Sequence, residues 1–496
     1  MNHPIVAAVL AGGGVFGAFV ACLAVVIAMQ LTARRGWGYV HLVFYGILLV
    51  GALTSLSSGR DLTSTALMLT APPAEVRHPL VALIQPLVSL FILTVCGERL
   101  LSRWLRPADA ARVPMALLLA YLLFWLGTIA APALLGSHPK LAHEFLYPLV
   151  IGLAMLVASG VERDLAFRAA RNALFVFIAL GLLLMPLLPR LVMDGAYNQG
   201  LLPGVPRLAG LAPHAVSLGL LSQLALLCLQ ARPFERRWLD RLMWLIGLSS
   251  LFLAQSKTAW IAFVLCSSCL LLLRRGPAFV RRATDPVRPE LGLLTVTCLM
   301  AAVTAACLLV MFGDIGGRIA EFLSTPEGAQ LSSLTGRDRI WEIARQEWAR
   351  SPVFGYGLTI WDADFRAAIG MPNATHAHNQ FMDTLSRSGS VGAAALVLYA
   401  LVLLVQSVRY ARITGGLSLA LFLALALRSV SEVPLLLVGY GPELLAQLLL
   451  LMTLSAAAGH ARVTLPERQA ALREQRAALR PRSFPVARDL RVGGAA

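Results

Sequence analysis

Charged residues are scarce in this chain. Asp, Glu, Lys and Arg make up 14% of its 496 residues, whereas roughly a quarter of a soluble domain is charged. Hydrophobic residues make up 58%. The shortage of charge excludes an ordinary soluble domain, and apolar stretches long enough to cross about 30 Å of hydrocarbon recur along nearly the whole length.

We expect these apolar stretches to be helices, because in lipid the polar groups of the backbone must be satisfied within each segment. The sequence therefore predicts an all-α polytopic membrane protein with about 12 or 13 transmembrane helices. The expected spans cover approximately residues 5–30, 39–57, 79–97, 113–135, 144–160, 172–193, 208–230, 239–255, 258–273, 291–313, 390–408, 414–428 and 433–456. No internal repeat indicates a transporter-type symmetry.

The net charge of +16 could suggest a nucleic-acid partner, but its placement argues for a membrane instead. Arg residues gather in every second connection, at residues 34–35, 99–112, 163–171, 232–241, 274–288 and 409–412, and again after residue 456. This positive-inside pattern places those connections in the cytoplasm and the N-terminus outside. No Lys or Arg precedes the first apolar stretch, so it lacks the charged start of a secretory signal, and we expect that span to be retained.

One long polar segment divides the chain. We expect a bundle of about ten spans over residues 1–313, a polar loop outside the membrane with short amphipathic helices over 314–389, and about three further spans over 390–456. Residues 457–496 form a basic cytoplasmic tail that we expect to be disordered. The loop contains no cysteine, so no disulfide can cross-link it.

Within the loop, Asp338–Arg350 has the spacing of an amphipathic helix. Ser351-Pro352 should end that helix, and a Gly355-Tyr356-Gly357 turn should follow. The run Thr375–Phe381 then brings together two imidazoles and a carboxamide, and a helix should begin after His378-Asn379 and lead into the next span. A His outside lipid can titrate near neutral pH and move protons.

Two further outward connections carry a cation close to the membrane. Arg207 precedes one expected span, and Lys257 lies in the short hinge between two others. A cation so close to hydrocarbon marks a functional site by default, although each side chain could instead snorkel to the interface. Cations there suit a lipid diphosphate, and a neutral His can take the proton from an attacking hydroxyl. The residues therefore favour group transfer from a lipid diphosphate to an alcohol.

Two other interpretations of the histidine pair stay open. His376 and His378 could chelate a metal with Asp383 or Asp364 as a carboxylate, but metal sites normally need three or four ligands of recognisable spacing. Both imidazoles could also simply hydrogen-bond to loop carbonyls. We expect no metal and no cofactor.

Four groups of residues resemble the O-antigen ligase and polymerase family, bacterial membrane glycosyltransferases that act on undecaprenyl-diphosphate-linked glycans. The motifs are Arg207-Leu208-Ala209-Gly210, Ser256-Lys257-Thr258-Ala259, Gly336-Arg337-Asp338-Arg339-Ile340-Trp341 with Ser351-Pro352-Val353-Phe354-Gly355-Tyr356-Gly357, and His378-Asn379 with Gly389-Ser390-Val391-Gly392. Each motif alone is weak. The four in order span about residues 207–392 on one side of the membrane, and the loop part is specific.

The resemblance implies an inverting, metal-independent transferase in the bacterial inner membrane, with His378 as the general base. It implies that Arg207 and Lys257 hold the diphosphate of the undecaprenyl-linked glycan donor. Arg337 and Arg339 would assist the phosphates or orient the glycan. We group Asn379 and His376 with these substrate-binding residues; His376 would tune its neighbour.

Three positions depart from the family pattern. Lys257 stands where Arg is usual and offers a point charge without a bidentate fork. Pro213-His214-Ala215 reverses part of the His-Pro-Asn that commonly follows the Arg207 motif, so His214 receives no role. The span at 5–30 exceeds the usual twelve.

The acceptor distinguishes several possible functions. A ligase would use lipid A–core, a polymerase another lipid-linked glycan, and a protein transferase a protein hydroxyl; the single modest loop slightly favours the ligase. A flippase for lipid-linked glycans would need charged residues distributed through the spans, whereas here they cluster at one face. Membrane lipids are the remaining expected partners, and nucleic acid is not expected.

Overall fold

A computed structural model describes residues 23, 38–57, 60–62, 79–105, 113–158, 160–195, 205–285, 287, 289–312, 337–371 and 374–459. The expected first span at 5–30 (apart from Leu23), the tail beyond Gly459 and the Gly336 of the loop motif lie outside these residues. The described part is helical apart from one short two-stranded sheet. The predicted all-α membrane class is confirmed.

Five described helices are long and apolar enough to cross a membrane. They are α2 (Tyr39–Ser57), the continuous run Met115–Leu135 formed by α4 (Met115–Trp125), η3 (Leu126–Ala130) and α5 (Ala131–Leu135), residues Glu162–Leu183 of α7 (Gly160–Leu183), α11 (Lys257–Ala283) and α17 (Gln380–Arg409). Shorter apolar helices are His143–Leu156, comprising η4 (His143–Phe145) and α6 (Leu146–Leu156), then α9 (Ala215–Ala231), α18 (Leu417–Ser431) and Leu444–Gly459. The remaining helices are α3 (Pro79–Leu105), α8 (Pro189–Val192), α10 (Arg237–Leu253), α12 (Glu290–Phe312), α15 (Arg337–Arg350) and α16 (Ala363–Ala368).

A helix overlaps every expected span from 39–57 onward, but several boundaries differ from the expectation, and two of these differences coincide with prolines. The helix expected at 172–193 ends at Leu183, because prolines at 186 and 189 interrupt the apolar run. The helix expected at 433–456 begins only at Leu444. The twelve residues before it form a loop that contains Pro434, Pro442 and a left-handed Gly439.

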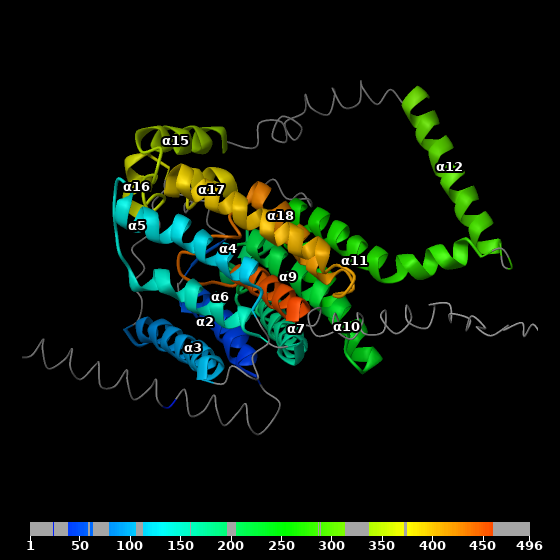
Figure 1. Cartoon of the computed structure of the whole chain (residues 1–496), viewed down its shortest axis with the longest axis horizontal. Helices are drawn as coiled ribbons and strands as arrows, with labels where there is room; N and C mark the ends of the chain where they lie inside the picture. The colour runs from blue at the N-terminus through cyan, green and yellow to red at the C-terminus, as the bar shows by residue number, and fades with distance from the viewer. Residues whose placement is uncertain are drawn as a thin grey trace, which may run out of the picture.

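Helix α9 is the centre of the bundle. It packs against α7, α10 and α11, and nearly all of its side chains are buried. Around it, α2 packs against α3 and α7, the α4–η3–α5 run packs against α17, and α18 packs against both α11 and α17. Figure 1 shows α15 and α16 gathered at one end of this bundle, beside the start of α17, while α12 projects away from the other helices.

Helix α17 is broken at Gly389, whose φ of 62° and ψ of −163° are not helical. The break leaves backbone groups without helical partners, and the Pro352–Gly357 segment supplies replacements. Tyr356 N and Gly357 N donate to Ser386 O and Arg387 O at 2.9 and 3.0 Å, while Ser390 N and Val391 N donate to Pro352 O and Val353 O at 2.8 and 3.2 Å. A side chain at Gly389 would lie 2.3 Å from Val353 O. We call this hydrogen-bonded pairing of the Pro352–Gly357 segment with the break at Gly389 the glycine lock.

Gly392, the second glycine of the Gly389–Gly392 motif, allows a close contact between two helices. Gly392 faces Gly127 in the π-helical turn η3, where an added Cβ on Gly392 would lie 3.2 Å from Gly127 O. One turn earlier, Ser388 Oγ donates to Thr128 O at 3.0 Å. Small residues let the two helices approach closely, so α17 is fixed against the bundle immediately below the loop.

The short sheet positions one of the cationic motifs. β1 (Met193–Asp194) pairs antiparallel with β2 (Arg207–Leu208), so that Asp194 lies opposite Arg207. From β2 the chain turns into α9 through residues 209–214. The Arg60 guanidinium donates to the carbonyls of Gly210, Ala212 and Pro213 at 2.7 to 2.9 Å, which holds this turn in place.

Candidate active site

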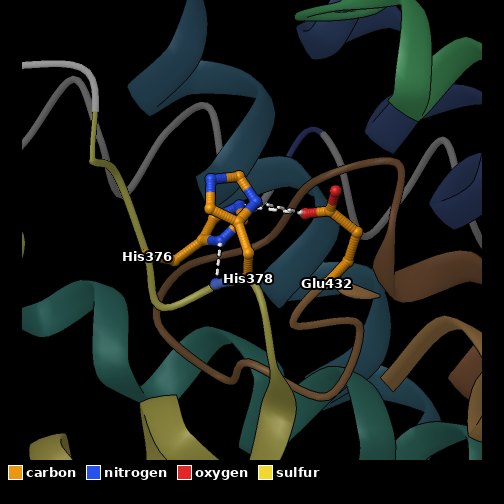
Figure 2. Close-up of side chains that lie close together, drawn as sticks. All are labelled: His376, His378 and Glu432. Carbon is orange, nitrogen blue, oxygen red and sulfur yellow. Dashed lines mark hydrogen bonds and ion pairs between the residues drawn. The ribbon is translucent and has the colours of Figure 1, made fainter. Parts of the chain in front are cut away.

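Two histidines and a glutamate meet at the end of the bundle that carries α15 and α16. His376 and His378 come from the loop before α17, and Glu432 is the residue that ends α18. Figure 2 shows both rings turned toward the Glu432 carboxylate. His376 Nε2 lies 3.3 Å and His378 Nδ1 3.4 Å from Glu432 Oε2. The two rings meet edge to face, with centroids 4.2 Å apart.

The loop that carries the histidines is held by its neighbours. Trp341 Nε1 of α15 donates to Ala377 O at 2.9 Å, and Ala377 N donates to Asp383 Oδ1 at 3.1 Å. Asp383 is itself buried and bound by Arg387 Nε at 3.1 Å. These bonds anchor the residue between the two histidines from both sides.

His378 has a left-handed backbone with φ of 48°. This conformation is uncommon for a residue with a side chain and costs about 1–3 kcal/mol, so it persists only where the surroundings enforce it. Its neighbour Asn379 contributes to that enforcement: its Oδ1 accepts from Met382 N at 3.0 Å and caps α17, while its Nδ2 donates to Val430 O at 3.2 Å. The predicted start of a helix after His378-Asn379 is confirmed.

The hydrogen bonds assign the tautomer of His376. Its Nδ1 accepts the backbone N–H of His378 at 3.1 Å, so in the neutral ring the proton lies on Nε2, directed at Glu432. Burial, followed by the neighbouring His378, lowers the pKa of His376 to about 4. His376 is therefore neutral at physiological pH.

Glu432 is a buried carboxylate with 7% exposure. Burial alone would raise its pKa, but His378, Arg428 and His376 together outweigh this and lower the pKa to about 2. Arg428, one helical turn earlier in α18, is also buried. The charged carboxylate is thus stabilised by the Arg428 guanidinium and by the two imidazoles beside it.

His378 Nδ1 lies at ion-pair distance from Glu432, but the atom is buried without a hydrogen bond. The His378 side chain is 30% exposed, so the rest of the ring reaches solvent. The ring therefore has one nitrogen on the carboxylate side and the other free to meet a substrate.

A polar cavity of about 410 Å³ opens on the other side of this cluster. Its lining includes His214, His376, Arg428, Glu432, Tyr440 and Glu443. His214 is the N-cap of α9, where its Nδ1 accepts from Ser217 N at 3.2 Å. Its ring is accessible through the cavity but enclosed by protein, and that burial lowers its pKa.

An apolar groove of about 350 Å³ begins on the opposite side of the histidine loop. It runs between α17 and α18, from Asn379 and Phe381 near the site to Leu396, Leu403 and Phe422 in the membrane-spanning part. Its walls are almost entirely hydrocarbon. The His–Glu cluster therefore lies between a polar cavity and an apolar groove.

Of the predicted site residues, His376 lines this cavity, whereas Lys257 belongs to a neighbouring helix start. Lys257 is the first residue of α11, and Ser256 before it lies against Gly219 of α9, 2.9 Å from an added Cβ. Ser217 of the same helix lines the cavity. Lys257 has an exposed side chain and is not among the residues that line the cavity.

The predicted arginines have varied surroundings. Arg207 is not free, because its Nη2 binds Asp194 Oδ2 at 2.6 Å, with both side chains mostly buried. Arg337 begins α15 and lies within electrostatic reach of Arg428. Arg339 is exposed on the same helix.

Glu432 and Arg428 were not among the predicted residues, and neither Asp383 nor Asp364 takes the third place beside the histidines. Asp383 is used by Ala377 and Arg387, and Asp364 is exposed on α16. A signal was present in the sequence, because ionisable residues within or next to apolar segments mark functional sites by default.

The described helices and this polar cluster define a multi-helix membrane protein with a site built from imidazole, carboxylate and guanidinium groups at one end of its bundle. Residues 242–397 match the family model described as O-antigen ligase, which supports the resemblance of this chain to the O-antigen ligase and polymerase family. The matched segment contains Lys257 and the histidine loop, and it ends before Glu432. No curated protein matches the chain.

Proposed function

We propose that this protein is a glycosyltransferase that moves a glycan from undecaprenyl diphosphate to a hydroxyl of lipid A–core on the periplasmic face of the bacterial inner membrane. The observation that carries the proposal is the pairing of an exposed His378 ring with the buried Glu432 carboxylate. A carboxylate on one ring nitrogen and a free nitrogen on the other form the orienting half of a general-base site.

The chemistry follows from the two ring nitrogens of His378. Glu432 favours the tautomer with the proton on Nδ1, which leaves Nε2 as an acceptor. The acceptor hydroxyl gives its proton to Nε2 while its oxygen bonds to the anomeric carbon, and the bond from that carbon to the diphosphate oxygen breaks with its electron pair. One displacement inverts the anomeric centre. Glu432 stabilises the imidazolium that forms, and the reaction needs no metal.

The leaving diphosphate needs positive charge. Lys257, exposed at the start of α11, and the buried Arg428 in the cavity wall are suited to supply it. Arg207 joins them in this proposal, and because it binds Asp194 it must exchange that partner for phosphate. The apolar groove beside Asn379 provides hydrocarbon walls for a lipid chain next to the reacting centre.

The remaining predicted residues have supporting roles in this proposal. His376 Nε2 lies 3.3 Å from Glu432 Oε2, so that His376 shares the carboxylate with His378. Asn379 fixes the start of α17 against the end of α18. Arg337 and Arg339 project from α15 above the site, where they orient the glycan.

Glycan analysis of a strain lacking the gene tests the reaction and its acceptor. The proposal predicts lipid A–core without attached glycan, restored by the wild-type gene. Cores that carry only single repeats would identify a polymerase instead, and loss of protein-linked glycan a protein transferase. Normal glycans of all three kinds would refute a transferase function.

A further inference from the structure

We propose that His376, His378 and Glu432 form a Zn²⁺ site whose occupation inhibits the enzyme. This inference rests on the proposed function for its consequence, because the atoms that would bind the metal are those that prepare the base. The binding itself is independent of any activity and is argued first.

The spacing of the three ligand atoms fits a zinc ion. His376, His378 and Glu432 each offer one ligand atom, and these atoms lie within 4.8 Å of one another. The two nitrogen–oxygen distances are 3.3 and 3.4 Å. Ligand atoms at 2.0–2.1 Å from a tetrahedral Zn²⁺ lie about 3.3–3.4 Å apart. The two nitrogen–oxygen distances therefore already match those around a bound zinc ion.

The ligand types select zinc over the harder cations. Mg²⁺ and Ca²⁺ prefer sites made of oxygen ligands, whereas two imidazoles and one carboxylate suit Zn²⁺ and related transition metals. Three protein ligands leave a fourth position, which opens to the polar cavity and can take water.

The hydrogen bond and the backbone conformation that hold these ligands in place also resemble those of a metal site. The backbone N–H of His378 holds His376 Nδ1 and so directs Nε2 at the shared centre, the kind of outer bond that orients metal-ligating histidines. His378 Nδ1 is buried without a hydrogen bond, and its residue is kept in a strained left-handed conformation. A metal ion would give this orphaned nitrogen the partner it lacks.

Zinc would disable the base through the tautomer of His378. A neutral imidazole carries one proton. When Nδ1 binds the metal, that proton must lie on Nε2, which then cannot accept the proton of a hydroxyl. The metal also occupies the Glu432 carboxylate that would have stabilised the imidazolium.

The test uses the full-length protein, purified in detergent and freed of metal with a chelator. Co²⁺ binding is followed by the visible absorption of four-coordinate cobalt, and Zn²⁺ binding by its displacement of cobalt. Glycan transfer from the lipid-diphosphate donor is measured separately, with chelator and with added Zn²⁺. The variants are His376→Asn and Glu432→Gln, and the matched control is His143→Asn, an exposed histidine of η4 outside the cluster.

We expect one metal ion per chain, an affinity weakened more than about 100-fold in both cluster variants, and unchanged binding in His143→Asn. Zinc should inhibit the wild-type transfer, and chelator should restore it. Metal binding that is absent, or equally strong in the cluster variants, would overturn the zinc site whatever the activity. Transfer that rises with zinc would overturn the inhibition. A chelated wild-type protein without transfer would instead refute the proposed function, while the cobalt spectrum still decides the site.

Discussion

Replacing Glu432 by Gln removes the carboxylate charge while keeping the size of the side chain. The carboxylate is 3.4 Å from His378 Nδ1, with side chains only 10% and 30% exposed. With an effective dielectric of about 20, a unit charge at this distance stabilises an imidazolium by up to about 5 kcal/mol. At 1.36 kcal/mol per tenfold change, we expect kcat to fall on the order of 10³-fold.

The assay is glycan transfer by purified protein at saturating donor, with Glu342→Gln on the exposed face of α15 as the matched control. The donor KM should change little, because Glu432 acts on the base rather than on the diphosphate. Arg428 loses a nearby countercharge in the variant, so thermal unfolding must show that both proteins are folded. A folded Glu432→Gln protein with kcat close to the wild-type value would refute the role of the carboxylate.

Three further predictions concern donor binding by Arg207, the glycine lock at Gly389 and the membrane topology. Arg207→Ala should raise the donor KM about 10-fold or more through a lost charge-assisted bond, and an unchanged donor dependence would reject its assignment. Gly389→Ala should destabilise the protein far more than Gly370→Ala in a thermal unfolding assay. Both glycines have positive φ, which costs about 1–2 kcal/mol, but only at Gly389 would the new Cβ meet backbone, 2.3 Å from Val353 O. A membrane-impermeant maleimide should label Gln346→Cys but not Arg412→Cys in intact cells, and the reverse result would invert the orientation.

Much of the fold follows from hydrophobic periodicity. Expected spans such as 39–57 coincide with helices because a continuous apolar run in lipid has no other way to satisfy its backbone. The expected helix at Asp338–Arg350 is present as α15, with Ile340 and Ala344 buried. The start of α17 directly after Asn379 could also be predicted, since Asn is a preferred N-cap.

The interruptions were harder to foresee. The break at Gly389 depends on hydrogen bonds from the Pro352–Gly357 segment, more than thirty residues away in the sequence. The loop before Leu444 contains apolar residues that resemble part of a transmembrane span when only the sequence is considered. Local sequence cannot reveal either arrangement, because both depend on tertiary contacts that replace helical hydrogen bonds.

The candidate site was anticipated in part. A polar run within an apolar chain identifies His376 and His378, but it does not reveal their carboxylate partner. Glu432 lies 54 residues after His378 in the sequence and reaches it only because α17 and α18 pack together. Helix packing, which single-sequence patterns do not encode, decides which charged residue completes the site.

The central claim is that His378 is the base for glycan transfer. The most direct measurement compares His378→Ala with the wild-type protein for two quantities, binding of the lipid-diphosphate donor and the rate of transfer to the acceptor. The claim predicts a rate lowered about 10²–10⁴-fold with donor binding nearly unchanged. A His378→Ala protein that inserts normally and transfers glycan at the wild-type rate would contradict it.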